Sequence, residues 1–178
     1  MIKECSLCKE SKLEIGIKTE YGAVVIYRNG NEGDGWFATL SPKTIGDVKK
    51  DFTIQIMPIP HIKHISHIND SENLAKNYGI AFAKVSKAIN DIMKEEGHTD
   101  NEEKMIRIGI YGKSKHPEEH FHIKLFPWEH PYVVDTTYEN KETQIDNEGK
   151  KFLKTTPVKK TLIEEATLDY LARKLIGF

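Results

Sequence analysis

The sequence contains no run of about 18 apolar residues, the length that a helix needs to cross a bilayer. Its first residues lack the apolar stretch of a signal peptide. The formal net charge is only −1, so no global basic field favours binding to a nucleic-acid duplex. Internal repeats and low-complexity segments are absent as well. These absences lead us to expect a cytoplasmic protein without membrane attachment.

Cysteine is also scarce, because the chain has only Cys5 and Cys8, in one C-x-x-C. In a reducing compartment such a pair more often binds a metal or takes part in redox chemistry than forms a structural disulfide. Two thiolates at this spacing suit tetrahedral zinc, and any further strong ligands would have to be histidines. The candidates are His61, His64, His67, His98, His116, His120, His122 and His130. Spacing alone does not choose among them, and a redox pair or two inert thiols would leave the same pattern.

The chain has 178 residues, of which 38% are hydrophobic and 30% charged, which is typical of a protein with one sizeable core. Alternation of apolar and polar residues predicts short strands. The expected hairpin and strands cover residues 13–28, 36–40, 52–57, 105–111 and 120–126. Loops are expected at 29–35, 41–50 and 112–119.

One long helix is predicted over residues 71–96, where apolar side chains recur at helical spacing. Asp70 or Ser71 can cap its start, and Gly97 suits its end. Strands followed by a helix and more strands predict an α+β fold with an antiparallel sheet.

The remainder of the chain is interpreted as an extension over residues 127–178, added to a main domain over 1–126. Short strands are expected at 133–137 and 151–155, around a turn at 146–149. A final helix is expected from about residue 162, with Thr161 and Glu164 as a capping box.

The segment HFHIKLF carries the most suggestive pattern. On a strand, His120, His122 and Lys124 share one face, and the apolar residues between them share the other. Three nitrogen-bearing side chains in a row suit an anionic ligand, since burying them without partners is costly. A half-exposed strand with polar outward residues would show the same alternation.

Several features in this order resemble the histidine-triad (HIT) superfamily. Its members have an apolar strand ending in Pro-x-x-His, then a helix, then a strand of the form His-φ-His-φ-His, where φ is apolar. Here Pro58-Ile59-Pro60-His61 fits the first motif, and HFHIKLF fits the second at two of three histidines. The resemblance covers roughly residues 5–126 and excludes the tail. It implies a HIT-like α+β fold, and a homodimer, because such proteins commonly form two-fold dimers.

The resemblance also implies a metal site. Many bacterial members begin with C-x-x-C and hold a structural zinc ion with those thiolates, the Pro-x-x-His histidine and the first triad histidine. Carried over, the ligands are Cys5, Cys8, His61 and His120. Such a Cys₂His₂ set leaves no open coordination position, as in structural zinc sites.

By the same resemblance, His122 is the nucleophile. A neutral imidazole attacks the α-phosphorus of a nucleotide conjugate and forms a nucleotidyl-histidine intermediate. A histidine that only binds phosphate, or a satisfied surface histidine, is the alternative. At the third triad position family hydrolases have histidine, and the uridylyltransferase-like branch has glutamine, but this chain has Lys124. Charged lysine cannot accept a hydrogen bond, although it can hold a phosphate oxygen. Lysine at position 124 therefore fits a phosphate-binding protein at least as well as a hydrolase.

The positions expected near the leaving group also differ from the family pattern. Many members carry a Gln-Ser pair where this chain has His116 and Pro117. His116 is a candidate proton donor to the leaving group, and Lys113 and Ser114 are candidate ligand-binding residues in the same loop.

For the nucleoside, the family's ribose-contacting acid corresponds to Thr39, with Asp34 as a nearby substitute. Trp36, Phe37 and Leu40 either wall a base pocket or pack in the core. The leading hypothesis is a nucleotidyl hydrolase or transferase that acts on a nucleotide or nucleotide conjugate. The alternatives are a nucleotide-binding module without turnover and a zinc-stapled interaction protein that uses residues 127–178.

Overall fold

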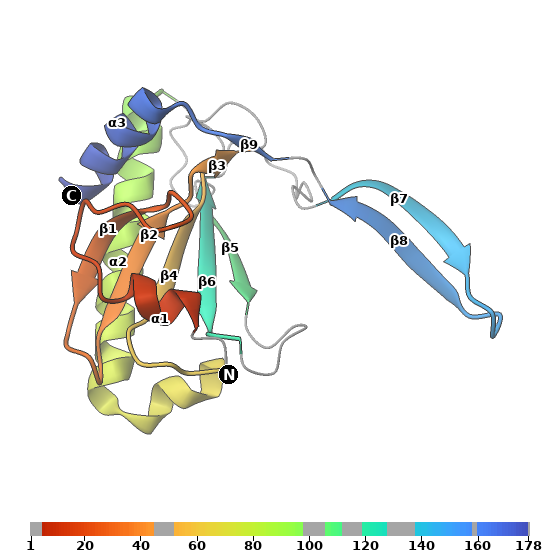
Figure 1. Cartoon of the computed structure of the whole chain (residues 1–178), viewed down its shortest axis with the longest axis horizontal. Coiled ribbons are helices and arrows are strands. Elements are labelled where there is room, and N and C mark those ends of the chain that lie inside the picture. Colours follow the sequence, from red (N-terminus) through yellow and green to blue (C-terminus); the bar gives the residue numbers. More distant parts are fainter. Residues whose placement is uncertain are drawn as a thin grey trace.

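The computed structural model describes residues 5–44, 52–97, 106–111, 119–127, 138–157 and 160–177. An antiparallel five-stranded sheet in the order β1-β2-β4-β6-β5 forms its centre (Figure 1). Its strands are β1 (Val24–Asn29), β2 (Trp36–Leu40), β4 (Ile54–Pro58), β5 (Ile106–Tyr111) and β6 (His122–Pro127). With one long helix on the sheet and a helix near the C-terminus, the chain has the expected α+β fold.

The long helix α2 (Glu72–Glu95) covers one face of the sheet. The Ser71 hydroxyl accepts a hydrogen bond from the Leu74 N–H at 3.4 Å, and Gly97 follows the helix with φ +71°. Its buried stripe packs against the inward residues of the strands, including Ile56 and Ile123. The expected helix over 71–96 is therefore confirmed. Among the described residues, no helix is long and apolar enough to cross a bilayer.

The opposite face of the sheet, which we call the front face, carries the short helix α1 (Ser6–Glu10). Strand alternation directs to it the residues between those of the main core: Phe37, Thr39, Gln55, Met57, His122 and Lys124. Leu7 of α1 packs against a small apolar cluster of Phe37, Met57 and Ile59. Polar candidate residues and this buried apolar cluster thus lie on the same face of the sheet.

The C-terminal extension returns to the sheet. Strand β9 (Thr161–Leu162) pairs with β3 (Lys43–Thr44), and helix α3 (Glu165–Ile176) packs on α2 and β1. Leu168, Leu171 and Leu175 belong to the same core as the sheet. Before β9 in the chain, β7 (Tyr138–Ile145) and β8 (Lys151–Pro157) form a hairpin that extends away from the sheet in Figure 1.

Three expectations about local structure need correction. The loop expected at 41–50 contains the short strand β3, which forms because it pairs with β9 from the C-terminal extension. The capping box is wrong, because α3 begins at Glu165 and Glu164 caps it without a side-chain hydrogen bond. Thr161 instead lies in β9, where its hydroxyl donates to the Thr44 carbonyl at 3.4 Å. The expected hairpin over 13–28 is a regular strand only in its second half. Its first half nevertheless pairs with that strand, through the bridge of Lys18 with Val24 and through hydrogen bonds from the Gly16 N–H to the Val25 carbonyl and from the Val25 N–H to the Ile17 carbonyl. The strand expected at 133–137 falls outside the described residues.

Candidate functional site

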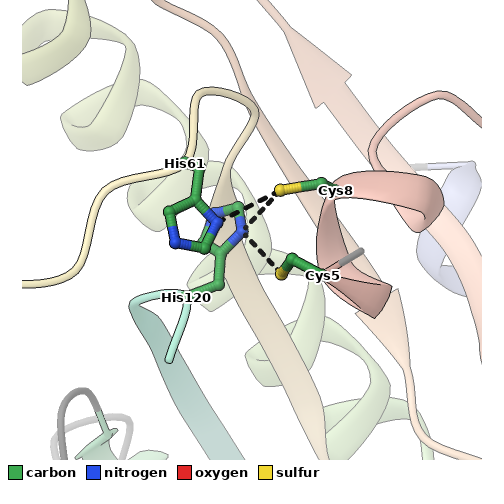
Figure 2. A group of neighbouring side chains, drawn as sticks. All are labelled: Cys5, Cys8, His61 and His120. Atoms are coloured by element: carbon green, nitrogen blue, oxygen red, sulfur yellow. Dashed lines mark hydrogen bonds between the residues drawn. The ribbon is translucent and has the colours of Figure 1, made fainter. Parts of the chain in front are cut away.

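Four side chains from three separate parts of the chain meet at one end of the front face (Figure 2). They are Cys5, Cys8, His61 and His120, and their ligand atoms all lie within 4.8 Å of one another. The Cys8 Sγ is 3.2 Å from His61 Nδ1 and 3.5 Å from His120 Nδ1, and the Cys5 Sγ is 3.7 Å from His120 Nδ1. This donor set could hold a metal ion.

Local structure explains how the four side chains converge. Cys5 is the N-cap of α1 and Cys8 lies in its first turn, so a spacing of three residues puts both thiols on one side. His61 lies in the loop after β4, and His120 lies two residues before β6. The Phe121 N–H donates to the Ile62 carbonyl at 2.8 Å, which holds this loop beside the start of the strand.

The hydrogen bonds of His120 show which ring nitrogen faces the thiols as a ligand. Its side chain is 1% exposed, and Nε2–H donates to the Pro58 carbonyl at 2.9 Å. Nδ1 therefore carries the lone pair directed at Cys5 and Cys8. Burial, together with the neighbouring His61, lowers the pKa of His120 to about 4. The neutral tautomer with Nδ1 free of a proton is the form that binds metals, and the backbone bond orients it.

The other candidate ligands are not part of this cluster. His64 and His67 are exposed in the 3₁₀-helix region η1 (Ile65–Asp70), and His64 accepts a hydrogen bond from the Ser66 N–H. His98, His116 and His130 lie outside the described residues. The structure thus brings together the four residues that the resemblance implied.

His122 lies next to the cluster, on the front face of β6. It is 8% exposed, and its Nδ1–H donates to the His120 carbonyl at 3.1 Å. Burial lowers the pKa of His122, and the Lys124 charge lowers it further, whereas the backbone hydrogen bond and Glu119 act in the opposite direction. The ring is therefore neutral near pH 7, with the lone pair on Nε2. A neutral imidazole of defined orientation can act as a nucleophile or accept a proton.

Lys124 belongs to a polar row across the front face. It pairs with Gln55 of β4, which in turn pairs with Thr39 of β2. A cavity of about 300 Å³ opens between α1 and strands β2 and β4, and its lining includes Thr39, Gln55, Lys43 and Glu10. Gln55, Lys43 and Glu10 were not among the predicted site residues. The alternation of 52–57 put Gln55 opposite the apolar residues, but only the strand register shows that it borders Lys124.

The residues predicted for a nucleoside pocket are distributed differently. Phe37 is fully buried beneath Leu7 and Met57, so it does not wall an open pocket. The Asp34 carboxylate accepts a hydrogen bond from the Asn31 N–H at 2.9 Å, and Asn77 donates to the Asp34 backbone carbonyl. Asp34 therefore stabilises its own loop, and only Thr39 of this group lines the cavity, although it is just 1% exposed.

The two other residues considered for the base pocket face the core. Trp36 donates from Nε1 to the Leu74 carbonyl at 2.9 Å, and Leu40 is buried in the main core, so both pack against α2. Lys113, Ser114 and His116 lie outside the described residues.

No family model, curated protein or solved structure matches this chain. The functional assignment therefore depends on the geometry of the site.

Proposed function

We propose that this chain binds a nucleotide or nucleotide conjugate on the front face of its sheet, and that His122 is the nucleophile toward the α-phosphorus. The observation that carries the proposal is the orientation of His122. Its Nδ1–H is held by the His120 carbonyl, so the Nε2 lone pair is the reactive position. Lys124, two residues along the strand, supplies a positive charge on the same face. Membership of the HIT superfamily is part of this proposal and rests on the resemblance of the sequence motifs.

We further propose that the four-residue cluster holds a structural zinc ion. In a tetrahedral site with Zn–S near 2.3 Å and Zn–N near 2.1 Å, sulfur and nitrogen ligands lie about 3.6 Å apart. The S–N separations of 3.2, 3.5 and 3.7 Å here are close to that value. Bound zinc would tie α1 and the loop after β4 to the start of β6. It would supply no open coordination position, so its role is to hold His120 and the neighbouring strand in place.

The proposed reaction has two displacements. The Nε2 lone pair of His122 forms a bond to the α-phosphorus, and the bond from phosphorus to the leaving group breaks. The leaving group departs with that electron pair and takes up a proton. Water then attacks the nucleotidyl-histidine, the P–N bond breaks, and a nucleoside monophosphate leaves while a proton is lost to solvent. Dividing one displacement into two is what covalent catalysis offers.

Lys124 favours a second candidate, a nucleotide-binding module with weak or no turnover. A charged lysine can hold a non-bridging phosphate oxygen, but it cannot accept a hydrogen bond as a third histidine could.

Turnover by a His122 variant separates the candidates. The wild-type chain is incubated with adenosine phosphoramidate and with dinucleoside polyphosphates, beside His122→Ala, His122→Gln and the exposed control His67→Ala. We expect turnover in the wild type and in His67→Ala, and a loss of about a hundredfold or more in both His122 variants. Circular dichroism and metal content show whether each variant retains the fold.

Each other outcome has a definite meaning. Equal turnover in the folded His122 variants rejects the nucleophile. Nucleotide binding by calorimetry with no product over hours supports the binding module. Neither binding nor turnover rejects both functions.

A further inference from the structure

A buried carboxyl group that the proposed reaction does not use lines the front-face cavity. It belongs to Glu10, the last residue of α1, which is only 7% exposed. Within the described part of the chain, no hydrogen bond or ion pair reaches this carboxylate. Carboxylates that are buried in proteins normally have donors that replace the lost water. The chain therefore places a strong acceptor in the cavity and supplies no donor for it.

The geometry of α1 explains why Glu10 faces the sheet. Leu7 and Glu10 are three residues apart, so they lie on the same side of the helix. Leu7 packs against the cluster of Phe37, Met57 and Ile59 on the front face. Glu10 is therefore directed toward the same face of the sheet. An apolar side chain could be buried there without loss of water from a charge, whereas a carboxylate is costly unless it binds something.

The rest of the cavity lining indicates what kind of ligand could bind. Hydroxyl groups can both donate and accept hydrogen bonds, and a side-chain amide can do the same. The lining includes one amide residue and four residues with hydroxyl groups, namely Gln55, Ser6, Tyr21, Thr39 and Ser41. The exposed Lys43 adds a positive charge, which disfavours a cationic ligand. Such a lining suits a neutral group with several hydroxyls.

The size and position of the cavity fit a single sugar ring. Its volume of about 300 Å³ is at the lower end of the range for ligand pockets. Gln55 of the lining pairs with Lys124, and His122 lies two residues before Lys124 on the same face of β6. One strand spacing across and two residues along amount to roughly 8 Å between the backbones at Gln55 and His122. A sugar in the cavity and a phosphate at His122 can therefore belong to one nucleotide.

We infer that the front-face cavity binds a sugar unit, and that Glu10 accepts hydrogen bonds from two neighbouring hydroxyl groups of that sugar. The two oxygens of a carboxylate can each accept one such bond, which supplies the donors that the chain does not provide. The inference rests on the proposed function in one respect, since a nucleotide at His122 makes the sugar a ribose. It makes Glu10 a residue that selects ribose over sugars without the hydroxyl pair.

Calorimetry on the full chain tests this contact from both sides. Adenosine monophosphate is compared with its 2′,3′-dideoxy analogue, which lacks the hydroxyl pair. Both ligands are titrated into the wild type, Glu10→Gln and the control Glu14→Gln, an exposed glutamate four residues further along. We expect the wild type and Glu14→Gln to bind adenosine monophosphate about tenfold more tightly than the analogue, as for hydrogen bonds to a charged acceptor. In Glu10→Gln this ratio should fall to about twofold or less, because only one neutral acceptor oxygen remains.

The ratio of the two affinities separates ligand contact from a structural role. A folded Glu10→Gln that binds both ligands more weakly but keeps the wild-type ratio would overturn the inference. Equal affinity of the wild type for both ligands, or no binding of adenosine monophosphate, would overturn it as well. Putrescine should not bind, and putrescine binding that depends on Glu10 would show that the carboxylate serves a cation instead of a sugar.

Failure of this inference is separable from failure of the proposed function. Turnover that depends on His122, with equal affinity for the two ligands, rejects only the sugar site. A preference for adenosine monophosphate that depends on Glu10, without any turnover, supports the sugar site and rejects only the enzyme.

Discussion

At the scale of single residues, His120 and His122 have opposite assignments because they keep their protons on different nitrogens. His120 donates from Nε2 to the Pro58 carbonyl and presents Nδ1 to the thiols. His122 donates from Nδ1 to the His120 carbonyl, so Nε2 is its basic nitrogen. His120 therefore suits metal binding, and His122 suits a role as nucleophile or proton acceptor, although only Phe121 separates them in the sequence.

Removal of one proposed metal ligand should affect both metal content and stability. His61→Ala should reduce bound zinc well below one ion per chain and destabilise the fold by at least about 2 kcal/mol, because metal binding contributes folding free energy. For a chain of this size, that is a fall in Tm of about 4–8 °C. Metal analysis of untagged protein and thermal unfolding measure the two effects. His67→Ala, an exposed histidine on the same segment, should retain metal and Tm, and equal losses in both variants would refute the assignment of His61.

Glu10 supplies a prediction that depends on pH. It is 7% exposed, and burial, aided by Glu20, raises its pKa above the ordinary 4.5. The folded chain therefore binds this proton more tightly than the unfolded chain does, so stability is lost as the pH rises from 4.5 through the folded pKa. Glu10→Gln should consequently have the higher Tm at pH 8, and this difference should shrink toward pH 4. A Tm difference that does not change with pH would show that burial of the charge is not the cause.

Some residues of the candidate site could be predicted from the sequence, and others could not. The four cluster residues could be named only through the resemblance to the HIT superfamily, because spacing alone did not choose among the eight histidines. Gln55 could not, because its proximity to Lys124 depends on the register of β4 against β6. The Asp34 carboxylate accepts hydrogen bonds from the Asn31 N–H and from the Asn77 side-chain amide. The ligand contact expected for Asp34 remains a prediction.

At the scale of elements, α2 was predictable because its apolar stripe, its Ser71 cap and Gly97 all indicate the same boundaries. The start of α3 was not, because the local signal at Thr161 competes with strand pairing to Thr44, more than a hundred residues earlier. Local pattern therefore identified the helix, and a long-range contact decided where it begins.

Helix α3 should contribute to the stability of the main core. Leu171 is 0% exposed and packs in the cluster that contains α2 and the sheet. Leu171→Ala should therefore cost about 2–5 kcal/mol in chemical denaturation. Ile176→Ala, at a position that is 40% exposed in the same helix, should change stability by no more than about 0.5 kcal/mol. A small effect of Leu171→Ala would mean that α3 is not integrated into the core.

At the scale of the whole molecule, the two faces of the sheet have different tasks. The face covered by α2 forms the main core, and the front face carries the metal-ligand cluster, His122, Lys124 and the cavity. The extension joins both faces, since α3 enters the core while β9 pairs beside the cavity lining. The boundary predicted at 126/127 and the homodimer remain predictions.

The most direct test of the proposed function is detection of the covalent intermediate. Single-turnover reactions with adenosine phosphoramidate are quenched in alkali, which preserves phosphorus–nitrogen bonds to histidine, and the intact chain and its peptides are weighed by mass spectrometry. The account predicts a transient adenylyl adduct on the peptide containing His122, absent from His122→Gln and present in His67→Ala. Product formation without any adduct, or an adduct that persists in His122→Gln, would contradict it.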